Sequence, residues 1–304
     1  MKLVFAGTPA VAVPALEALA ARHQIVAVVT RPDAPLGRKR VLTPSPVAEA
    51  AERLGLPVIK AARLDAEATE EIAARGAELG VIVAYGGLVR EPLLSTPARG
   101  WVNLHFSLLP RWRGAAPVQW SIIAGDRETG ATVFQLQPGL DDGPIWSMTR
   151  TAIAPHETAG TLLGRLALSG AEQLADTVDA IAAGETAPVE QSGEVTLAPK
   201  LSIDDARLDF GEPADRVYDR IRGVTPEPGA FTEIDGARLK VHDTAPVRDH
   251  PRLEPGVIEA RQGEVLVGTA TEPLRLISVQ PAGKKSMAAT DWWRGQNVER
   301  MIAR

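Results

Sequence analysis

Apolar positions in the first 183 residues follow two patterns: short apolar runs, and longer stretches with apolar residues three or four positions apart. The runs predict buried strands, and the stretches predict amphipathic helices. We expect strands over residues 2–6, 25–29, 58–59, 81–84, 101–106, 131–136 and 145–150, and helices over residues 9–21, 45–55, 66–75, 116–124 and 161–183. Strands that alternate with helices through short connections are typical of parallel βαβ units. The pattern therefore predicts an α/β fold with a doubly wound, mostly parallel sheet, and such sheets bind ligands beyond the carboxyl ends of their strands.

Two of the predicted helices begin at recognisable capping residues. Thr8 and Pro9 are placed as the N-cap and first residue of the first helix, and Ser45 and Pro46 have the same places in the second. The opening strand, turn and helix contain no G-x-G-x-x-G sequence, which argues against a nicotinamide or flavin dinucleotide site. Residues 31–45, before the second helix, are expected to form a long loop.

The pattern changes after residue 183. Residues 184–203 lose their periodicity and are expected to form a linker. One helix is predicted near residues 213–222, and short strands follow over residues 230–234, 237–242, 255–260, 264–268 and 274–279. Several short strands at regular spacing suggest a small barrel. We therefore expect a domain over residues 1–183, a linker over residues 184–203 and a second domain over residues 204–304.

Asn103 and His105 lie two residues apart in one predicted strand. Side chains at that spacing point to the same side of a strand, so the two should lie together. An amide there supplies a hydrogen-bond donor beside an imidazole that titrates near neutral pH. A lone buried histidine is more simply explained as a core residue, but the shared face and the loop that follows favour a functional site.

Asp141 lies in a later loop, residues 138–144, that is rich in glycine and proline. Taken alone, an aspartate in such a loop is best explained by turn formation. Taken with Asn103 and His105, it completes a set of three groups suited to acid–base chemistry. A carboxylate near His105 is expected to raise the pKa of the imidazole and to orient its ring. Which of the two groups would act as the base stays open at this point.

The loop Ser107, Leu108, Leu109 and Pro110, directly after the Asn103/His105 strand, is apolar where loops are usually polar. It suits the wall of a pocket for a flat ligand better than it suits a plain turn.

Length and composition agree with a two-domain globular protein. The chain has 304 residues, 45% of them hydrophobic and 23% charged. It contains no cysteine, which excludes disulfides and makes a reducing cytoplasm the simplest setting. No apolar stretch reaches the ~18 residues of a membrane span, so we expect no membrane. The histidines outside the predicted site show no metal-ligand spacing, and we expect no metal.

The net charge of −5 argues weakly against a nucleic-acid partner, but one segment departs from the average. Residues 31–40 hold Arg31, Arg38, Lys39 and Arg40 against a single acidic residue, Asp33. A local basic loop on an acidic protein can still bind phosphates. On charge alone, a solvated surface loop is the simpler explanation.

Together these segments resemble the folate-dependent formyltransferase family. That family carries an Asn-x-His-x-Ser-Leu-Leu-Pro segment, matched by residues 103–110, and a later Leu-Asp-x-Gly loop, matched by residues 140–143. Further matching segments are Phe5–Pro9, Pro35–Arg40, Pro44–Pro46, Val83–Gly86, Leu108–Pro117 and Gln280–Lys285. The resemblance covers nearly the whole chain and is weakest over residues 204–275.

The resemblance implies transfer of a formyl group from 10-formyltetrahydrofolate to an amine, with Asn103, His105 and Asp141 as the catalytic residues. In this family Ser107, Leu108, Leu109 and Pro110 would line the folate pocket, and main-chain groups near Tyr85 and Leu140 would bind the pterin edge.

The family members most similar to this chain use methionyl initiator tRNA as the acceptor. The resemblance then implies that residues 204–304 form an OB-like β-barrel that binds tRNA, and that Arg38, Lys39 and Arg40 contact its acceptor arm. Lys284 and Lys285 are a second candidate for RNA contact. We expect a monomer.

Two alternatives stay open. The first keeps the chemistry but changes the acceptor to glycinamide ribonucleotide, an amino sugar or water. The basic loop and the additional domain argue against it. The second is a folate-binding or RNA-binding module without catalysis, and the presence of all three candidate catalytic residues argues against that.

Overall fold

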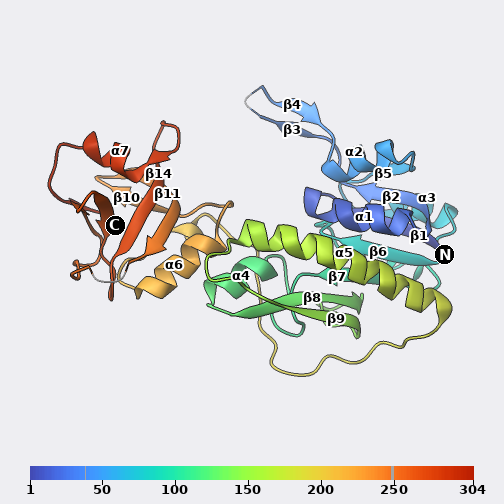
Figure 1. Cartoon of the computed structure of the whole chain (residues 1–304). Coiled ribbons are helices and arrows are strands. Elements are labelled where there is room, and N and C mark those ends of the chain that lie inside the picture. Colours follow the sequence, from blue (N-terminus) through green and yellow to red (C-terminus); the bar gives the residue numbers. More distant parts are fainter. Residues whose placement is uncertain (38, 248–249) are drawn as a thin grey trace. The chain divides into compact units, whose positions relative to one another are not determined.

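The computed structural model describes residues 1–37, 39–247 and 250–304, and the chain forms two compact units. The first unit contains residues 1–117, 129–152 and 163–199, and the second contains residues 118–128, 153–162 and 200–304. Figure 1 labels the helices and strands of both units.

The first unit is built on a seven-stranded sheet with the strand order β5-β2-β1-β6-β7-β8-β9. Its strands are β1 (Lys2–Gly7), β2 (Gln24–Thr30), β5 (Val58–Lys60), β6 (Leu79–Val83), β7 (Trp101–His105), β8 (Glu128–Gln135) and β9 (Ile145–Ala152). The helices up to residue 183 are α1 (Val13–Ala20), α2 (Pro46–Arg53), α3 (Ala66–Ala74), α4 (Pro117–Ile123) and α5 (Ala159–Ala183), with 3₁₀ turns at Ala10–Ala12 and Leu93–Ser95. The strands from β5 to β7 pair in parallel, whereas β8 runs antiparallel to β7. The predicted mostly parallel, doubly wound sheet is confirmed.

The interior strands β6 and β7 of the sheet pack closely against each other. Trp101, at the start of β7, is fully buried, and its indole N–H donates to the carbonyl of Leu93 at 2.9 Å. The ring lies against Gly80 in β6, where an added Cβ would come within 2.1 Å of the indole carbons. Glycine is therefore required at position 80 by the tryptophan of the neighbouring strand.

We expect Gly80→Ala to destabilise the protein by about 1–3 kcal/mol, because the extra methyl group overpacks the core. The matched control is Gly164→Ala on α5, where no atom lies near the added Cβ. That change should stabilise the chain by roughly 0.5–1 kcal/mol, since alanine is the better helix former. The midpoints of urea unfolding measure both. Equal midpoints for the two variants would contradict the packing argument.

One of the two predicted helix caps is confirmed and the other is wrong. Ser45 is the N-cap of α2, and its hydroxyl accepts from the N–H of Ala48 at 3.0 Å. Thr8 does not cap α1, which begins only at Val13 after a 3₁₀ turn. The hydroxyl of Thr8 donates instead to the carbonyl of Tyr85 at 3.1 Å, so it joins the ends of two neighbouring strands.

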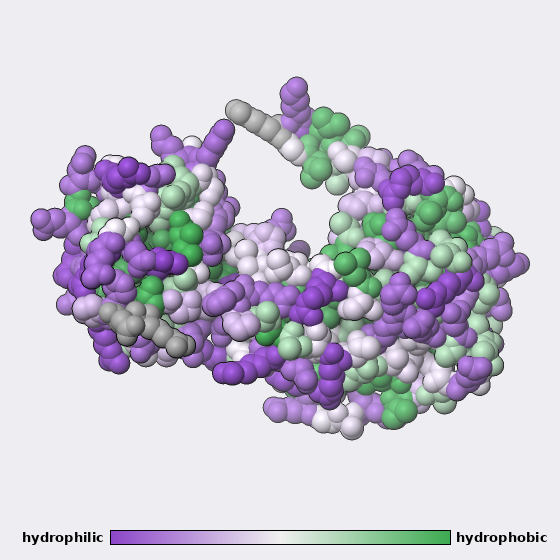
Figure 2. Space-filling view, viewed as in Figure 1, coloured by the Kyte–Doolittle hydropathy of each residue, from purple (hydrophilic) through white to green (hydrophobic). Residues whose placement is uncertain are grey.

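The long loop predicted over residues 31–45 contains a hairpin of β3 (Ala34–Leu36) and β4 (Val41–Thr43), paired antiparallel. The hairpin projects from the sheet of its unit (Figure 1). Leu36, Val41 and Leu42 on it are each at least 60% exposed. Figure 2 shows hydrophobic surface on the hairpin. The side chains of β3 and β4 are almost all exposed, so burial does not impose an alternating pattern of apolar and polar residues on these strands. Their sequence therefore carries no strand signal.

The second unit is an antiparallel sheet with the strand order β10-β11-β14-β13-β12-β16. Its strands are β10 (Phe231–Ile234), β11 (Ala237–Pro246), β12 (Val257–Arg261), β13 (Glu264–Val267), β14 (Leu274–Pro281), β15 (Met287–Ala288) and β16 (Met301–Ile302), and its helices include α6 (Ala214–Gly223) and α7 (Ala289–Arg294). Glu233 in β10 exchanges two backbone hydrogen bonds, of 3.1 and 2.9 Å, with Arg304 just after β16. These bonds join the two edges of the sheet, so the strands close into the small barrel that their spacing predicts.

Within residues 1–37, 39–247 and 250–304, no helix combines the length and apolar composition needed to cross a membrane.

Candidate active site

The first unit contains a cavity of about 490 Å³ at the ends of β6 and β7. This volume lies within the ~300–1,000 Å³ of typical small-molecule sites. It is lined by Ile82, residues 84–89, residues 103–106, Gly114, Ala115, Pro117 and residues 136–141. Asn103, His105 and Asp141, the three predicted catalytic residues, all lie on its wall. The strand spacing correctly placed Asn103 and His105 on one face.

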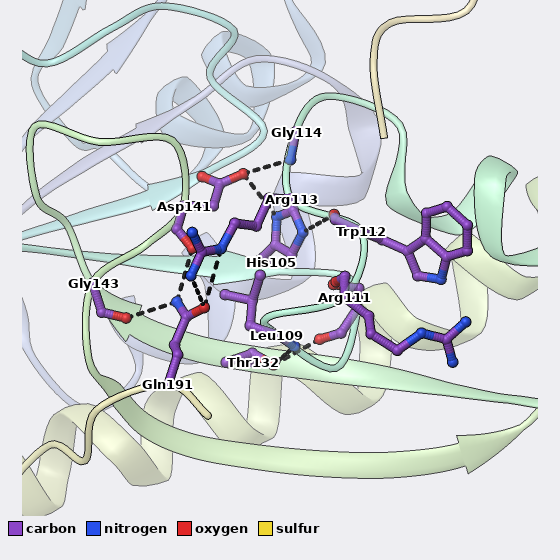
Figure 3. Close-up of polar contacts among 11 residues, drawn as sticks. His105, Leu109, Arg111, Trp112, Arg113, Gly114, Thr132, Asp141, Gly143 and Gln191 are labelled. Carbon is purple, nitrogen blue, oxygen red and sulfur yellow. Dashed lines mark hydrogen bonds and ion pairs between the residues drawn. The ribbon is translucent and has the colours of Figure 1, made fainter. Parts of the chain in front are cut away.

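The imidazole of His105 is buried and held in one orientation. Its Nε2 lies 2.8 Å from the backbone carbonyl of Trp112, as Figure 3 shows. A carbonyl can only accept, so Nε2 carries the proton and donates. The ring of Phe134 meets the imidazole edge-on, with centroids 6.3 Å apart and an interplanar angle of 85°. In the neutral ring, Nδ1 therefore carries the free lone pair.

Asp141 lies on the Nδ1 side of the ring. Its Oδ2 accepts from the N–H of Gly114 at 2.8 Å and lies 3.8 Å from Nδ1 of His105 (Figure 3). That separation leaves an electrostatic interaction without a direct hydrogen bond. Asp141 has φ +45°, a left-handed conformation that aspartate tolerates better than most residues.

Asp141 does not follow a parallel strand, although ligand-binding groups are expected at the carboxyl ends of parallel strands. It lies in the loop after β8, which is antiparallel to β7. Because β8 is antiparallel to β7, Gln135 at its end lies opposite Val102 near the start of β7. The loop after β8 must then return alongside β7 to bring Asp141 to His105 at the far end.

Burial lowers the pKa of His105 below its ordinary value, and this effect outweighs the opposing effects of the Asp141 charge and the Trp112 carbonyl. The expected effect of the carboxylate is confirmed, since the Asp141 charge raises the pKa of His105, but the net shift is downward because burial has the larger effect. The side chain is only 6% exposed, and loss of hydration destabilises the charged ring more than a carboxylate 3.8 Å away stabilises it. At neutral pH the imidazole is held in its neutral form.

Ser107, Leu108, Leu109 and Pro110 do not line this cavity. Ser107, Leu109 and Pro110 are buried and Leu108 is half-buried. The hydroxyl of Ser107 donates to the carbonyl of Arg111 at 2.6 Å, and the N–H of Leu109 donates to the hydroxyl of Thr132 at 3.3 Å. In the structure these residues shape the loop that leads from His105 to Trp112.

The segment after β6 forms another part of the cavity wall. The Tyr85 side chain is buried, and its hydroxyl donates to the carbonyl of Ala61 at 3.0 Å. Arg31, just before the β3–β4 hairpin, donates to the carbonyl of Gly86 at 2.6 Å. The hydrogen bonds of Arg31 and Tyr85 therefore hold the backbone of residues 85–86 in position at the cavity. Leu88 and Leu140, 70% and 55% exposed, are apolar residues on the wall.

Sequence reasoning missed a set of residues in the segment expected to be a linker. Residues 184–199 belong to the first unit, and Gln191 and Thr196 hydrogen-bond to the loops that carry Asp141 and Trp112. Nothing in the residue pattern indicates this, because the segment is held by hydrogen bonds and not by a buried apolar face.

Lys39, Arg40, Lys284 and Lys285 are not among the residues that line the cavity, and the prediction for Arg38 falls outside the described residues. Lys39 and Arg40 are exposed in the turn of the β3–β4 hairpin. Lys284 and Lys285 are exposed in the turn between β14 and β15, in the second unit. No group of three or more metal-ligating side chains that could hold an ion occurs among the described residues.

Comparison with known proteins places this chain among formyl transferases. The family model for formyl transferase matches residues 1–178, and the model for the formyl transferase C-terminal domain matches residues 200–297. The chain is 64% identical to a methionyl-tRNA formyltransferase of Clavibacter sepedonicus and 61% identical to that of Clavibacter michiganensis subsp. michiganensis, with 100% of each chain covered. Among solved structures, it resembles an N-formyltransferase from Helicobacter canadensis in complex with folinic acid and dTDP-3-aminofucose, with a TM-score of 0.71 and 17% identity over 92% of this chain and 99% of that one.

Proposed function

The chain belongs to the formyl transferase family, and on that basis we propose that it transfers the formyl group of 10-formyltetrahydrofolate to the free amino group of methionyl initiator tRNA. The product is N-formylmethionyl-tRNA for translation initiation. Full-length relatives of this activity, at 61% and 64% identity, support the assignment. The observation that carries it is the single cavity wall on which Asn103, His105 and Asp141 meet.

The reaction makes three chemical demands. The amine attacks the formyl carbon and a C–N bond forms, so the amine nitrogen must lose a proton. The carbonyl oxygen becomes an oxyanion and must be stabilised until the bond to N10 breaks. The departing N10 must gain a proton. No net oxidation or reduction takes place, so acid–base and hydrogen-bonding groups suffice.

In this mechanism His105 is the base. Its Nε2–H is already donated to Trp112, so Nδ1 takes the proton from the attacking amine. The lowered pKa keeps that lone pair available at neutral pH. Asp141, 3.8 Å away, stabilises the imidazolium once it forms. The same Nδ1–H then returns the proton to N10, and the side-chain amide of Asn103 donates to the oxyanion.

The donor lies along the rest of the cavity wall. Residues 84–89 and 136–140 line the cavity together with the catalytic residues. Backbone groups there bind the polar edge of the pterin, and Leu88 and Leu140 cover its apolar faces. Contact of Ser107, Leu108, Leu109 and Pro110 with the folate stays a prediction, with the loop backbone as the contacting part.

The acceptor RNA contacts the exposed basic residues. Lys39 and Arg40 lie at the turn of a projecting hairpin whose apolar side chains also face solvent. Arg38, by sequence, belongs to the same group. Residues 1–183 serve as the catalytic domain and residues 204–304 as the tRNA-binding domain, where Lys284 and Lys285 contact the RNA. Residues 184–203 connect the two domains, and residues 184–199 of this connection pack with the first unit. The enzyme acts as a monomer in the cytoplasm, where charged tRNA is used.

We expect Lys39→Gln and Arg40→Gln each to flatten the salt dependence of tRNA binding by about one phosphate contact, a change in slope near 0.9. Each variant loses one cation that releases a counterion from the RNA. The KM for the folate donor should be unchanged. Arg75→Gln, an exposed arginine at the C-cap of α3 and outside the hairpin, is the control. A salt slope that stays at the wild-type value in both hairpin variants would rule out this contact.

A single-turnover assay tests the proposed function. The enzyme is mixed with 10-formyltetrahydrofolate and charged initiator tRNA, with glycinamide ribonucleotide, or with a nucleotide-linked amino sugar. We expect rapid formylation of the tRNA alone. Formylation of either small amine at a comparable rate would reassign the acceptor, and donor binding without transfer to any acceptor would indicate a binding module.

A further inference from the structure

Residues 189–198, in the segment between the two predicted domains, contact the two loops that position His105 and Asp141. Asp141 and Gly143 lie on one loop, and Trp112 and Arg113 lie on the other. Residues 189–198 contact both loops through the side chains of Gln191 and Thr196: Gln191 donates to the Asp141 loop and accepts from Arg113, and Thr196 accepts from Trp112. All of these residues belong to the first unit.

Gln191 has every hydrogen-bonding group of its side-chain amide in use. Its Nε2 donates to the carbonyls of Asp141 and Gly143, both at 2.8 Å (Figure 3). Its Oε1 accepts from Nε and Nη2 of Arg113, at 3.2 and 2.6 Å. A flipped amide would set oxygen against two carbonyls and NH₂ against a guanidinium, so the orientation is determined. The amide therefore ties the Asp141 loop to Arg113, the residue before Gly114.

The second loop is held by the same segment. The N–H of Trp112 donates to the hydroxyl of Thr196 at 2.9 Å. The N–H of Arg113 donates to the carbonyl of Thr196 at 2.9 Å, and the N–H of Ala198 donates to the carbonyl of Arg113 at 2.8 Å. Trp112 has φ +63°, which is unfavourable for a bulky side chain and needs outside support. Its carbonyl accepts from His105, so the position of this loop sets the orientation of the imidazole.

We propose that Gln191 is a positioning residue for formyl transfer, which fixes the carboxylate of Asp141 relative to Nδ1 of His105. The inference rests on the proposed function and adds a residue to its site. Asp141 lies 3.8 Å from Nδ1 and accepts from Gly114, a glycine with φ +127° in the loop that Arg113 anchors. Removal of the Gln191 amide would break its hydrogen bonds to the carbonyls of Asp141 and Gly143. It would also break the link through Arg113 between the Asp141 loop and the loop that carries Gly114.

The test is Gln191→Met, which keeps the length of the side chain and removes its hydrogen bonds without adding charge. Displacement of a catalytic group by ~1 Å can cost ~100-fold, so we expect kcat to fall roughly 10- to 100-fold. The KM values for both substrates should change little. Gln191→Glu is the second variant. It keeps the link to Arg113 but turns a carboxylate oxygen toward the carbonyls of Asp141 and Gly143, so kcat should fall at least as far as in Gln191→Met.

NMR titration of the His105 imidazole provides a readout that needs no substrate. Because Asp141 raises the pKa of His105, movement of the carboxylate away from the ring should lower that pKa further. In an Asp141→Asn background, Gln191→Met should cause no further change in the pKa of His105, because position 141 then carries no charge to move. Gln173→Met is the matched control, since Gln173 also donates to a backbone carbonyl, that of Ala131, but lies outside the cavity lining. It should change stability and leave the titration in place.

An unchanged His105 titration together with kcat within about twofold of wild type would overturn the positioning role. Failure of the proposed function looks different: the wild-type enzyme would not formylate methionyl-tRNA, while the titration would still report whether Gln191 positions Asp141.

Discussion

Replacement of His105 by alanine is expected to reduce kcat by about two to four orders of magnitude, the usual contribution of a general base. Nδ1 of this ring is the group we assign to take the amine proton and return it to N10. The residue is buried, so truncation also leaves a cavity. His105→Gln is the safer companion, because its amide can still donate to the Trp112 carbonyl in place of Nε2.

Steady-state kinetics, with folate binding measured separately by fluorescence, checks this result. Folate affinity should survive in both His105 variants. Asn103→Ala, on the same strand face, should lower kcat by about 100- to 1,000-fold through loss of one oxyanion donor. A kcat near wild type for either the His105 variants or Asn103→Ala would remove that residue from the mechanism.

Asp141→Asn is expected to reduce kcat severely while leaving the fold intact. Asparagine also tolerates the left-handed φ of position 141, and its side-chain oxygen can still accept from Gly114. What is lost is the negative charge that stabilises the imidazolium. Crystallography or circular dichroism would confirm the fold, and single-turnover kinetics would measure the chemical step.

The pH profile gives Asp141→Asn a second signature. Burial lowers the pKa of His105, and the Asp141 charge opposes that shift. Wild-type activity should therefore fall on the acid side at a pH below the range of an ordinary histidine, as Nδ1 becomes protonated. Without the opposing charge the pKa falls further, so the acid limb of the variant should move to still lower pH. A shift toward higher pH would contradict the assigned electrostatics.

The double variant tests whether the two residues act together. Effects of groups that work as a unit are strongly non-additive. His105→Ala with Asp141→Asn should therefore be little slower than the worse single variant. Losses that multiply would mean that Asp141 acts independently of the imidazole, for instance as a direct proton acceptor.

The sequence by itself determined the elements whose signal is local. Apolar runs located the buried strands of the sheet, and the two-residue spacing placed Asn103 and His105 on one face, because alternation of side chains is a property of every strand. Ser45 was identified as a cap since its hydroxyl bonds within its own helix. The family resemblance rests on short sequence segments of the same kind. These segments were enough to select Asn103, His105 and Asp141, the three catalytic candidates that lie on the cavity wall.

The tertiary structure alone decided what depends on distant partners. The pairing direction of β8 fixes how the loop returns Asp141 to His105, and the direction of one strand is not written in its own residues. The lowered pKa of His105 results from burial by several segments at once. Gln191 lies in a stretch without periodicity, because a segment bound through backbone and amide hydrogen bonds needs no apolar face. Hydrophobic patterning reports burial, so it cannot report contacts that polar groups make across the fold.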